Sequence, residues 1–243
     1  MKKIGLAVVV ILLWSHTSSA GPSWSQISFT TAASQAPAVL AAADRFMSSP
    51  LGKTFPGKLL LQVNAVDGAN PATHTFVPIY KSTAEREKFV QSVQGNEAWT
   101  AFQSEMERLT QPAGIVLYRN VKSWGVINET DHVWMAHAFA VSDPPRFLAA
   151  LDRLMASSTG KKFPGQVYLS AVVAGGLSPV SHVISVGYDS EVEMDAWREV
   201  RDPSADWAAY LAASQGVSDY LGASMARDLK TWGPATLAEI VAR

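Results

Sequence analysis

Apolar positions follow two different periods along this chain. The stretch from His132 to Val141 is apolar and partly alternating, which is typical of a strand. Ser142-Asp143-Pro144 then supplies a capping residue and a proline, the usual start of a helix. Apolar residues follow it at helical spacing, namely Phe147, Leu148, Leu151, Leu154 and Met155. The pattern therefore predicts a strand followed by an amphipathic helix.

The same segment continues with two strands, a second helical region and a last strand. Val167 to Val173 is rich in β-branched residues, and His182 to Tyr188 alternates after a turn at Gly175-Gly176. Ser190 and Glu193 have the spacing of a capping box, which begins a helical region that is interrupted near Asp202-Pro203. A short strand around Met225 to Trp232 closes the unit. The predicted order is β-α-β-β-α-β, the ferredoxin-like split unit.

An earlier part of the chain repeats this pattern at a constant spacing. The repeated segments pair as follows: Asp44-Arg45-Phe46-Met47 with Asp152-Arg153-Leu154-Met155, Gly52-Lys53-Thr54-Phe55-Pro56-Gly57 with Gly160-Lys161-Lys162-Phe163-Pro164-Gly165, Ser82 and Glu85 with Ser190 and Glu193, Trp99 with Trp207, and Lys122-Ser123-Trp124-Gly125 with Lys230-Thr231-Trp232-Gly233. Such self-similarity predicts a tandem duplication. We expect a first repeat over 21–129 and a second over 130–243.

A β-α-β-β-α-β unit covers only one face of its sheet with helices, so its other face needs a partner. We expect the two units to supply it for each other. The predicted fold class is α+β, with two tandem ferredoxin-like β-α-β-β-α-β repeats packed sheet to sheet as an intramolecular α/β barrel. In each unit the first strand should lie beside the third.

This duplicated arrangement resembles the dimeric α/β-barrel superfamily, in a fused form in which one chain carries both halves. The resemblance rests on element order and duplication. It implies the barrel fold and a choice of activities, because that superfamily includes cofactor-free monooxygenases, haem-degrading monooxygenases and chlorite dismutase-like enzymes. It implies no particular activity for this chain.

The first 20 residues have the form of a secretory signal. A basic start, Met1-Lys2-Lys3, precedes the apolar run Ile4 to Trp14 and the small-residue exit Ser18-Ser19-Ala20. We therefore expect export to the periplasm or the cell exterior. No later segment has enough continuous apolar residues to span a bilayer, so no membrane association is expected after cleavage.

Composition excludes several kinds of chemistry. Lys and Arg number 20 against 21 Asp and Glu, for a net charge of −1, so nucleic acid is not an expected partner. The chain has no cysteine, which excludes disulfides, thiolate metal sites and cysteine nucleophiles. We expect no metal, since no sequence pattern offers the three protein ligands of a catalytic zinc. No cofactor is expected either, because no haem-ligand motif is present.

Two histidines and two tyrosines are the candidate catalytic residues. His74 and His182 open equivalent strands, and Tyr80 and Tyr188 follow them on the same strand face. A histidine at a barrel mouth with a tyrosine further along can bind a polar ligand or move protons near neutral pH. The alternative is a histidine that fastens the preceding turn. The sequence leaves open which strand face lines the barrel.

His137, Arg119 and Arg227 are the candidate ligand-binding residues. His137 should approach His182 from the neighbouring strand, and an inward-facing arginine holds a carboxylate well. The alternative for the cations of the last strand is pairing with Asp44, Asp152 or another acid.

Two functions from different classes follow. The first is an exported barrel that binds a small, apolar or aromatic molecule between its sheets without catalysis. The alternative is a cofactor-independent monooxygenase-like enzyme that uses the paired His and Tyr residues, and an assembly role comes third. We expect a monomer with pseudo-twofold symmetry or a higher oligomer.

Overall fold

The computed structural model describes residues 21–68, 70–176 and 179–242, and the expected leader over 1–20 lies outside them. The first half of the chain contains β1 (Ser23–Thr30), α1 (Ala36–Ser48), β2 (Lys58–Val66), β3 (His74–Tyr80), α2 (Thr83–Ser92), α3 (Glu97–Leu109) and β4 (Gln111–Gly125). The second half contains β5 (Val133–Val141), α4 (Pro144–Ala156), β6 (Gln166–Gly175), β7 (His182–Tyr188), α5 (Glu191–Arg201), α6 (Ala205–Ser214) and β8 (Ser218–Trp232), and it ends with α7 (Leu237–Val241). Short 3-10 turns at Gly52–Thr54 and Gly160–Lys162 follow α1 and α4.

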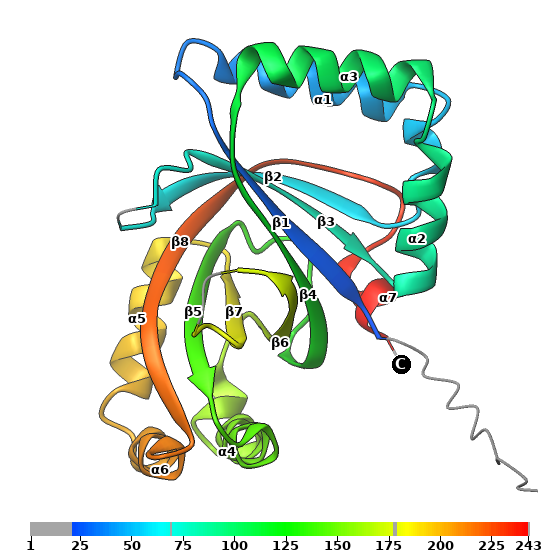
Figure 1. Cartoon of the computed structure of the whole chain (residues 1–243). Coiled ribbons are helices and arrows are strands. Elements are labelled where there is room, and N and C mark those ends of the chain that lie inside the picture. The colour runs from blue at the N-terminus through cyan, green and yellow to red at the C-terminus, as the bar shows by residue number, and fades with distance from the viewer. Residues whose placement is uncertain (1–20, 69, 177–178, 243) are drawn as a thin grey trace, which may run out of the picture.

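The strands form one closed antiparallel barrel in the order β1-β3-β2-β8-β5-β7-β6-β4. Helices α1, α2 and α3 lie outside one side of the barrel, and α4, α5 and α6 lie outside the other (Figure 1). The first strand of each half pairs with the third, as expected. The expected α+β barrel with external helices is therefore confirmed.

The two halves join through strand edges, so the expected sheet-to-sheet packing needs correction. Backbone hydrogen bonds link β2 to β8 on one side and β4 to β6 on the other. Both seams close because β4 and β8 are 15 residues long. Each pairs first with its own half and then crosses to the other half. The sequence predicted only Met225 to Trp232 as the last strand, because the preceding residues, Ser218 to Ser224, show no regular apolar alternation.

Each long strand is fastened to the other half at its end. Trp232 Nε1 donates to Asp44 Oδ1 of α1 at 2.8 Å, and Lys230 pairs with the same carboxylate at 2.6 Å. In the matching arrangement, Trp124 Nε1 donates to Asp152 of α4 at 2.9 Å, and Lys122 pairs with Asp152. The repeated Asp and Lys-x-Trp motifs are therefore the two parts of one contact between halves.

The glycine that ends each of these motifs completes the contact. Gly233 has φ +105°, and a Cβ at this position would lie 2.1 Å from the carbonyl oxygen of Gly57 in the other half. Gly125 has φ +85°, and its Cβ would lie 2.2 Å from the carbonyl oxygen of Gly165. Any larger residue would push the crossing strand away from the Phe-Pro-Gly turn that it contacts.

Local signals at the helices agree with the structure. The interruption near Asp202-Pro203 separates α5 from α6. The Ser82 and Ser190 hydroxyls accept from the amides of Glu85 and Glu193, as their spacing predicts. Within the part of the chain that the structure describes, no helix has both the length and the apolar character needed to cross a bilayer.

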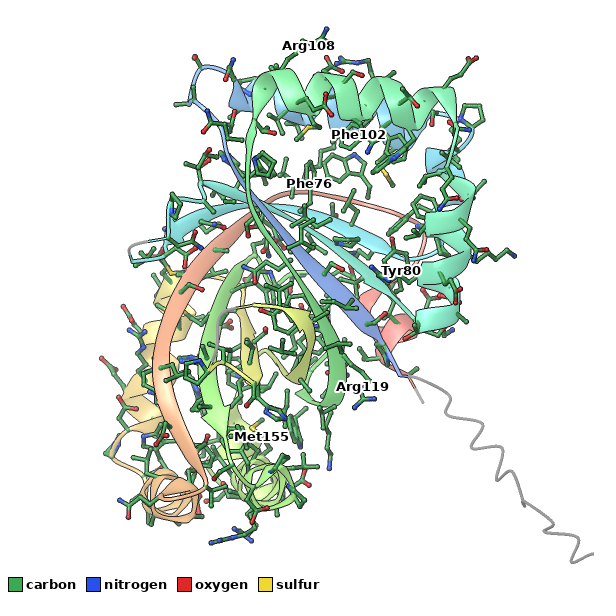
Figure 2. The ribbon with its side chains drawn as sticks, viewed as in Figure 1. Phe76, Tyr80, Phe102, Arg108, Arg119 and Met155 are labelled. Atoms are coloured by element: carbon green, nitrogen blue, oxygen red, sulfur yellow. The ribbon has the colours of Figure 1, made fainter. Side chains whose placement is uncertain are left out.

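The hydrophobic core lies between the helices and the outer face of the barrel. In the second half, Phe147, Leu151 and Trp197 pack against the outward residues of β5, β6 and β7, among them Leu169 and Ile184. In the first half, Phe76 contacts Phe102 of α3, and both lie between β3 and the α1–α3 layer (Figure 2). Because both hydrophobic cores lie outside the barrel, its interior does not have to be filled with apolar side chains to stabilise the fold.

We predict that Asp44→Ala and Asp152→Ala each lower the free energy of unfolding by about 1–2 kcal/mol. Each substitution leaves an indole N–H without its acceptor, and the partly exposed ion pair adds little. Urea unfolding measures the loss. Asp195→Ala, on the exposed face of α5, is the matched control and should change stability by less than about 0.5 kcal/mol. Equal losses in all three variants would contradict the proposed contact.

Candidate functional site

A cavity of about 790 Å³ occupies the interior of the barrel. Strand alternation explains its lining, because the even-numbered residues of β1, β2, β4, β5 and β6 face inward. The inward side chains that line it include Trp24, Gln26, Ser28, Leu60, Gln62, Asn64, Val77, Ile79, Val116, Tyr118, Asn120, Trp134, Ala136, Ala138, Tyr168, Val172, Val183, Ser185, Ser224 and Ala226. The size is suited to a small organic molecule.

Two aromatic pairs form parts of the cavity wall. Trp24 and Tyr118 stack with ring centroids 4.1 Å apart and an interplanar angle of 14°. Trp134 and Tyr168 lie 6.2 Å apart at 37°. Trp24 Nε1 donates to Ser170 Oγ at 3.0 Å, so that indole is fixed and presents its ring to the cavity.

A buried carboxyl group fixes the other indole. Asp228 Oδ2 accepts from Trp134 Nε1 at 3.0 Å, and its Oδ1 accepts from Gln62 Nε2 at 2.8 Å. Burial raises the pKa of Asp228, while the two hydrogen bonds and the charges of His132 and Lys58 oppose that rise. Asp228 is thus a carboxyl group in the barrel wall that accepts hydrogen bonds from an indole and from an amide, both of which are uncharged.

The two halves differ at this position. Asp228 lies opposite Gln62 across one seam, and Asn120 lies opposite Ser170 across the other. The first half therefore has an amide where the second half has a carboxyl group. The barrel wall therefore carries an ionisable group at only one of these two related positions.

Cations are missing from the cavity lining. Among the residues that the structure describes, no Lys, Arg or His contributes to it. Lys58, at the start of β2, is ion-paired with Glu129. Glu129 also accepts from the Leu237 amide at 2.6 Å, and Leu237 and Val241 of α7 line the cavity.

The predicted histidines lie outside this cavity. His74 stacks against Phe29, with ring centroids 5.8 Å apart, and its Nδ1 lies 2.9 Å from Thr73 Oγ1. His182 Nδ1 lies 3.0 Å from Ser181 Oγ. Burial lowers the pKa of both imidazoles. The expected alternative was a histidine that fastens the preceding turn by bonding a backbone carbonyl, and each imidazole instead contacts the hydroxyl group of the residue before it.

The predicted tyrosines also lie beneath the helices. Tyr80 packs against Phe55 and Phe89 between β3 and α2 (Figure 2). Tyr188 packs against Phe163 in the core of the second half. Burial raises the pKa of each to about 12, so neither releases a proton near neutral pH. A catalytic role for the four His and Tyr residues stays a prediction that the cavity does not support.

The predicted ligand-binding residues are on the outer face of the barrel wall, where Arg119 and Arg227 are exposed and His137 is partly buried. Arg227 is ion-paired with Glu191, and Arg119 extends from β4 toward solvent (Figure 2). His137 lies 3.5 Å from the Tyr220 hydroxyl, on the face of β5 that also carries Phe139. None of the three lines the cavity, so a shared ligand site for them stays a prediction without geometric support.

A bulge explains why Arg119 and Lys122 both avoid the interior. Simple alternation predicts opposite faces for them, but the pairing of β4 with β6 shifts register between Asn120 and Lys122. The bulge turns Lys122 outward to Asp152. Lys122 pairs with Asp152 and Lys230 pairs with Asp44, which confirms the alternative that the cations of the last strands pair with these acids.

Sequence reasoning missed Trp24, Trp134, Gln62 and Asp228. At the constant spacing of the repeated segments, Trp24 in the first half corresponds to His132 in the second. The strand pairing instead equates Trp24 with Trp134, because Trp24 lies opposite Ile79 and Tyr118 while Trp134 lies opposite Gly187 and Ala226. Allowing two extra residues between β1 and α1 in the first half would have aligned the two tryptophans.

The donor set of the cavity does not fit a haem group. Its lining offers no imidazole to the iron and no cation to the propionates, within the described residues. The same described ranges also contain no group of three or more His, Cys, Asp or Glu placed to hold a metal ion.

Solved structures share this architecture. A candidate monooxygenase from Lactobacillus acidophilus matches with a TM-score of 0.64 at 10% identity, over 89% of this chain and 98% of its own. A candidate monooxygenase from Fusobacterium nucleatum matches with a TM-score of 0.61 at 13% identity, over 90% and 97%. An anthrone oxidase-like protein matches with a TM-score of 0.56 at 14% identity, over 88% and 94%.

The chain has the dimeric α/β-barrel fold. No family model and no curated protein sequence matches it. At these identities the likeness concerns the fold, and the function has to be argued from the site.

We predict that His137 makes the protein less stable in acid. Burial, then Arg201 and Arg198, lower its pKa from 6.5 to about 4. Between these values the unfolded chain binds a proton that the folded chain does not, so stability falls as the pH falls through this range. The free energy of unfolding of wild type should therefore decline relative to His137→Gln between pH 6.5 and 4. Parallel pH profiles for the two proteins would show that the imidazole titrates normally.

Proposed function

We propose that this protein binds a small aromatic molecule inside the barrel. The observation that carries the proposal is the cavity of about 790 Å³ inside the barrel, with the Trp24–Tyr118 and Trp134–Tyr168 pairs in its wall. Fixed aromatic side chains recognise flat apolar molecules at little entropic cost, because hydrogen bonds already hold their rings. A hollow barrel that serves only as a scaffold would not need them.

The apolar residues that line the cavity support an uncharged body for the ligand. Leu60, Val77, Ile79 and Val183 are among the side chains that line the cavity. Burial of apolar ligand surface against them supplies affinity at roughly 25 cal/mol per Å² before the cost of association.

The alternative is a cofactor-independent monooxygenase-like activity. The fold likeness to candidate monooxygenases favours it, and so does a confined apolar cavity, which such chemistry uses. The residues first assigned to it, His74, His182, Tyr80 and Tyr188, lie beneath the helices. If the protein is an oxygenase, we propose that the chemistry occurs among the cavity residues.

We further propose that the chain arose by tandem duplication, that its first 20 residues direct export, and that one chain is a complete barrel. The repeated contact motifs support the duplication, because each motif contacts the other half in the same way. The basic and apolar leader supports export to the periplasm or the cell exterior. Both barrel seams lie within the chain, which supports a monomer with pseudo-twofold symmetry.

We predict that Ala226→Tyr abolishes binding in the cavity. Ala226 lies opposite Trp134, as Tyr118 lies opposite Trp24, so a tyrosine here would fill the space beside Trp134. The fluorescent probe 1-aminoanthracene, which is neutral at pH 7, should bind wild type and bind the variant at least tenfold more weakly. Fluorescence titration measures both affinities.

Ala223→Tyr is the matched control. Ala223 is exposed on the same strand and lies opposite His137 on the outer face. This variant should bind the probe like wild type. Failure of wild type to bind the probe, or equal weakening by both substitutions, would contradict a ligand site inside the barrel. Oxygen uptake with an anthrone substrate then separates the alternatives, because only an enzyme raises the rate above that of the protein-free autoxidation, and Ala226→Tyr should remove that increase.

A further inference from the structure

The charge inside the barrel is one-sided. Asp228 in the wall and Asp67 in the cavity lining are acidic. The cations of the crossing strands face outward: Lys122, Arg227 and Lys230 are ion-paired with Asp152, Glu191 and Asp44, and Arg119 extends toward solvent. At the barrel end near Asp228, Lys58 is neutralised by Glu129. A ligand in the cavity therefore experiences carboxyl groups without nearby free cations in its lining.

The polar side chain that lines the cavity beside Asp228 is that of Gln62. The Gln62 amide nitrogen donates to Asp228, which orients the amide and leaves its Oε1 for other partners. The Trp134 N–H donates to the same carboxyl group. Both donors near Asp228 are thus used within the protein, and a ligand that donates hydrogen bonds suits this part of the wall.

The aromatic wall next to these groups has the same preference. Ring faces carry negative electrostatic potential and attract ammonium groups. The faces of Trp134 and Tyr168 are adjacent here. Burial and the negative charges of Asp131 and Glu129 together raise the pKa of Tyr168. Tyr168 therefore has acidic residues near it in addition to Asp228.

We propose that the ligand of this cavity is an aromatic molecule that carries a protonated amine, with the amine beside Gln62 and Asp228. This inference rests on the proposed function, since it assumes that the cavity binds a ligand, and it names the chemical class. The carboxyl group of Asp228 acts through space and through the orientation of Gln62, so Asp228 is a positioning residue. A carboxylate-bearing ligand of the same shape is excluded by the acids.

Three isosteric competitors test the proposal: 1-naphthylmethylamine, 1-naphthylmethanol and 1-naphthoate. Each is titrated at pH 7 against the wild-type protein loaded with 1-aminoanthracene. The amine should displace the probe at a concentration at least tenfold lower than the alcohol, and the acid should not displace it. Because the three share one ring system, the comparison isolates the charge.

Asp228→Asn is the decisive variant, because it removes the carboxyl group. It also makes the second half match the first, which has Asn120 at the related position. The Asn side-chain oxygen still accepts one hydrogen bond, so the cavity should persist. The amine should lose its advantage over the alcohol in this variant, while the affinity for the alcohol changes less than twofold. Asp195→Asn, on the exposed face of α5, is the matched control and should keep the wild-type preference.

If Asp228→Asn does not fold, Gln62→Met replaces it, because this change removes the acceptor and keeps the length of the side chain. It should also reduce the advantage of the amine at least threefold. Equal displacement of the probe by the amine and the alcohol in wild type would contradict the proposal that the ligand carries a protonated amine. An unchanged preference for the amine in the folded variants would contradict it as well. Such a result with probe binding intact leaves the cavity as a ligand site. Absence of any binding by the probe and the three competitors rejects the cavity site and the amine together.

Discussion

The barrel depends on two strands that leave their own half of the chain and finish against the other. A β-α-β-β-α-β unit has free strand edges, and unpaired edges are unfavourable in isolation. Here the long strands β4 and β8 pair across both seams, and no edge of the barrel remains open. The Trp124–Asp152 and Trp232–Asp44 contacts fasten the ends of these strands. Without those crossings there would be two separate sheets and no enclosed interior.

Closure by strand edges also explains why the interior can be hollow. The large apolar side chains pack between the helices and the outer face of the barrel, where Phe147 and Leu61 are almost fully buried. Stability therefore comes from two peripheral cores and two seams of backbone hydrogen bonds. The inward positions are free to differ between halves, as Asn120 and Asp228 do. Divergence at such positions changes the ligand without loss of the fold.

The sequence predicted most of the architecture because its repeated motifs carry the contacts between halves. The Asp residues of α1 and α4, the Lys-x-Trp-Gly ends and the Phe-Pro-Gly turns all recur, and each has a partner in the other half. The length of β8 was missed because its first residues, from Ser218 to Ser224, lack an apolar alternation. Register shifts were missed as well, and the bulge near Asn120 reverses the face expected for Lys122.

The candidate site was predicted less well, for a physical reason. Both faces of each strand are enclosed, one by helices and one by the cavity, so alternation alone does not separate them. His74 and Tyr80 stood out as polar residues in apolar strands, yet both make local contacts beneath the helices. His74 contacts the Thr73 hydroxyl, and Tyr80 packs against Phe55. Trp24 and Gln62 were not distinguished, because their partners Ser170 and Asp228 come from the opposite half. Contacts that cross the seams have no spacing in the sequence to reveal them.

The central claim is that the interior of the barrel is where a ligand binds. Nitrogen-15 NMR of the tryptophan indoles during titration with 1-aminoanthracene tests it directly. The indole signals of Trp24 and Trp134 should shift in proportion to the bound fraction, while those of Trp124 and Trp232, which fasten the crossing strands outside, should stay in place. Shifts confined to Trp124, Trp232 or the helix-packed Trp197 would place binding outside the barrel and contradict the account.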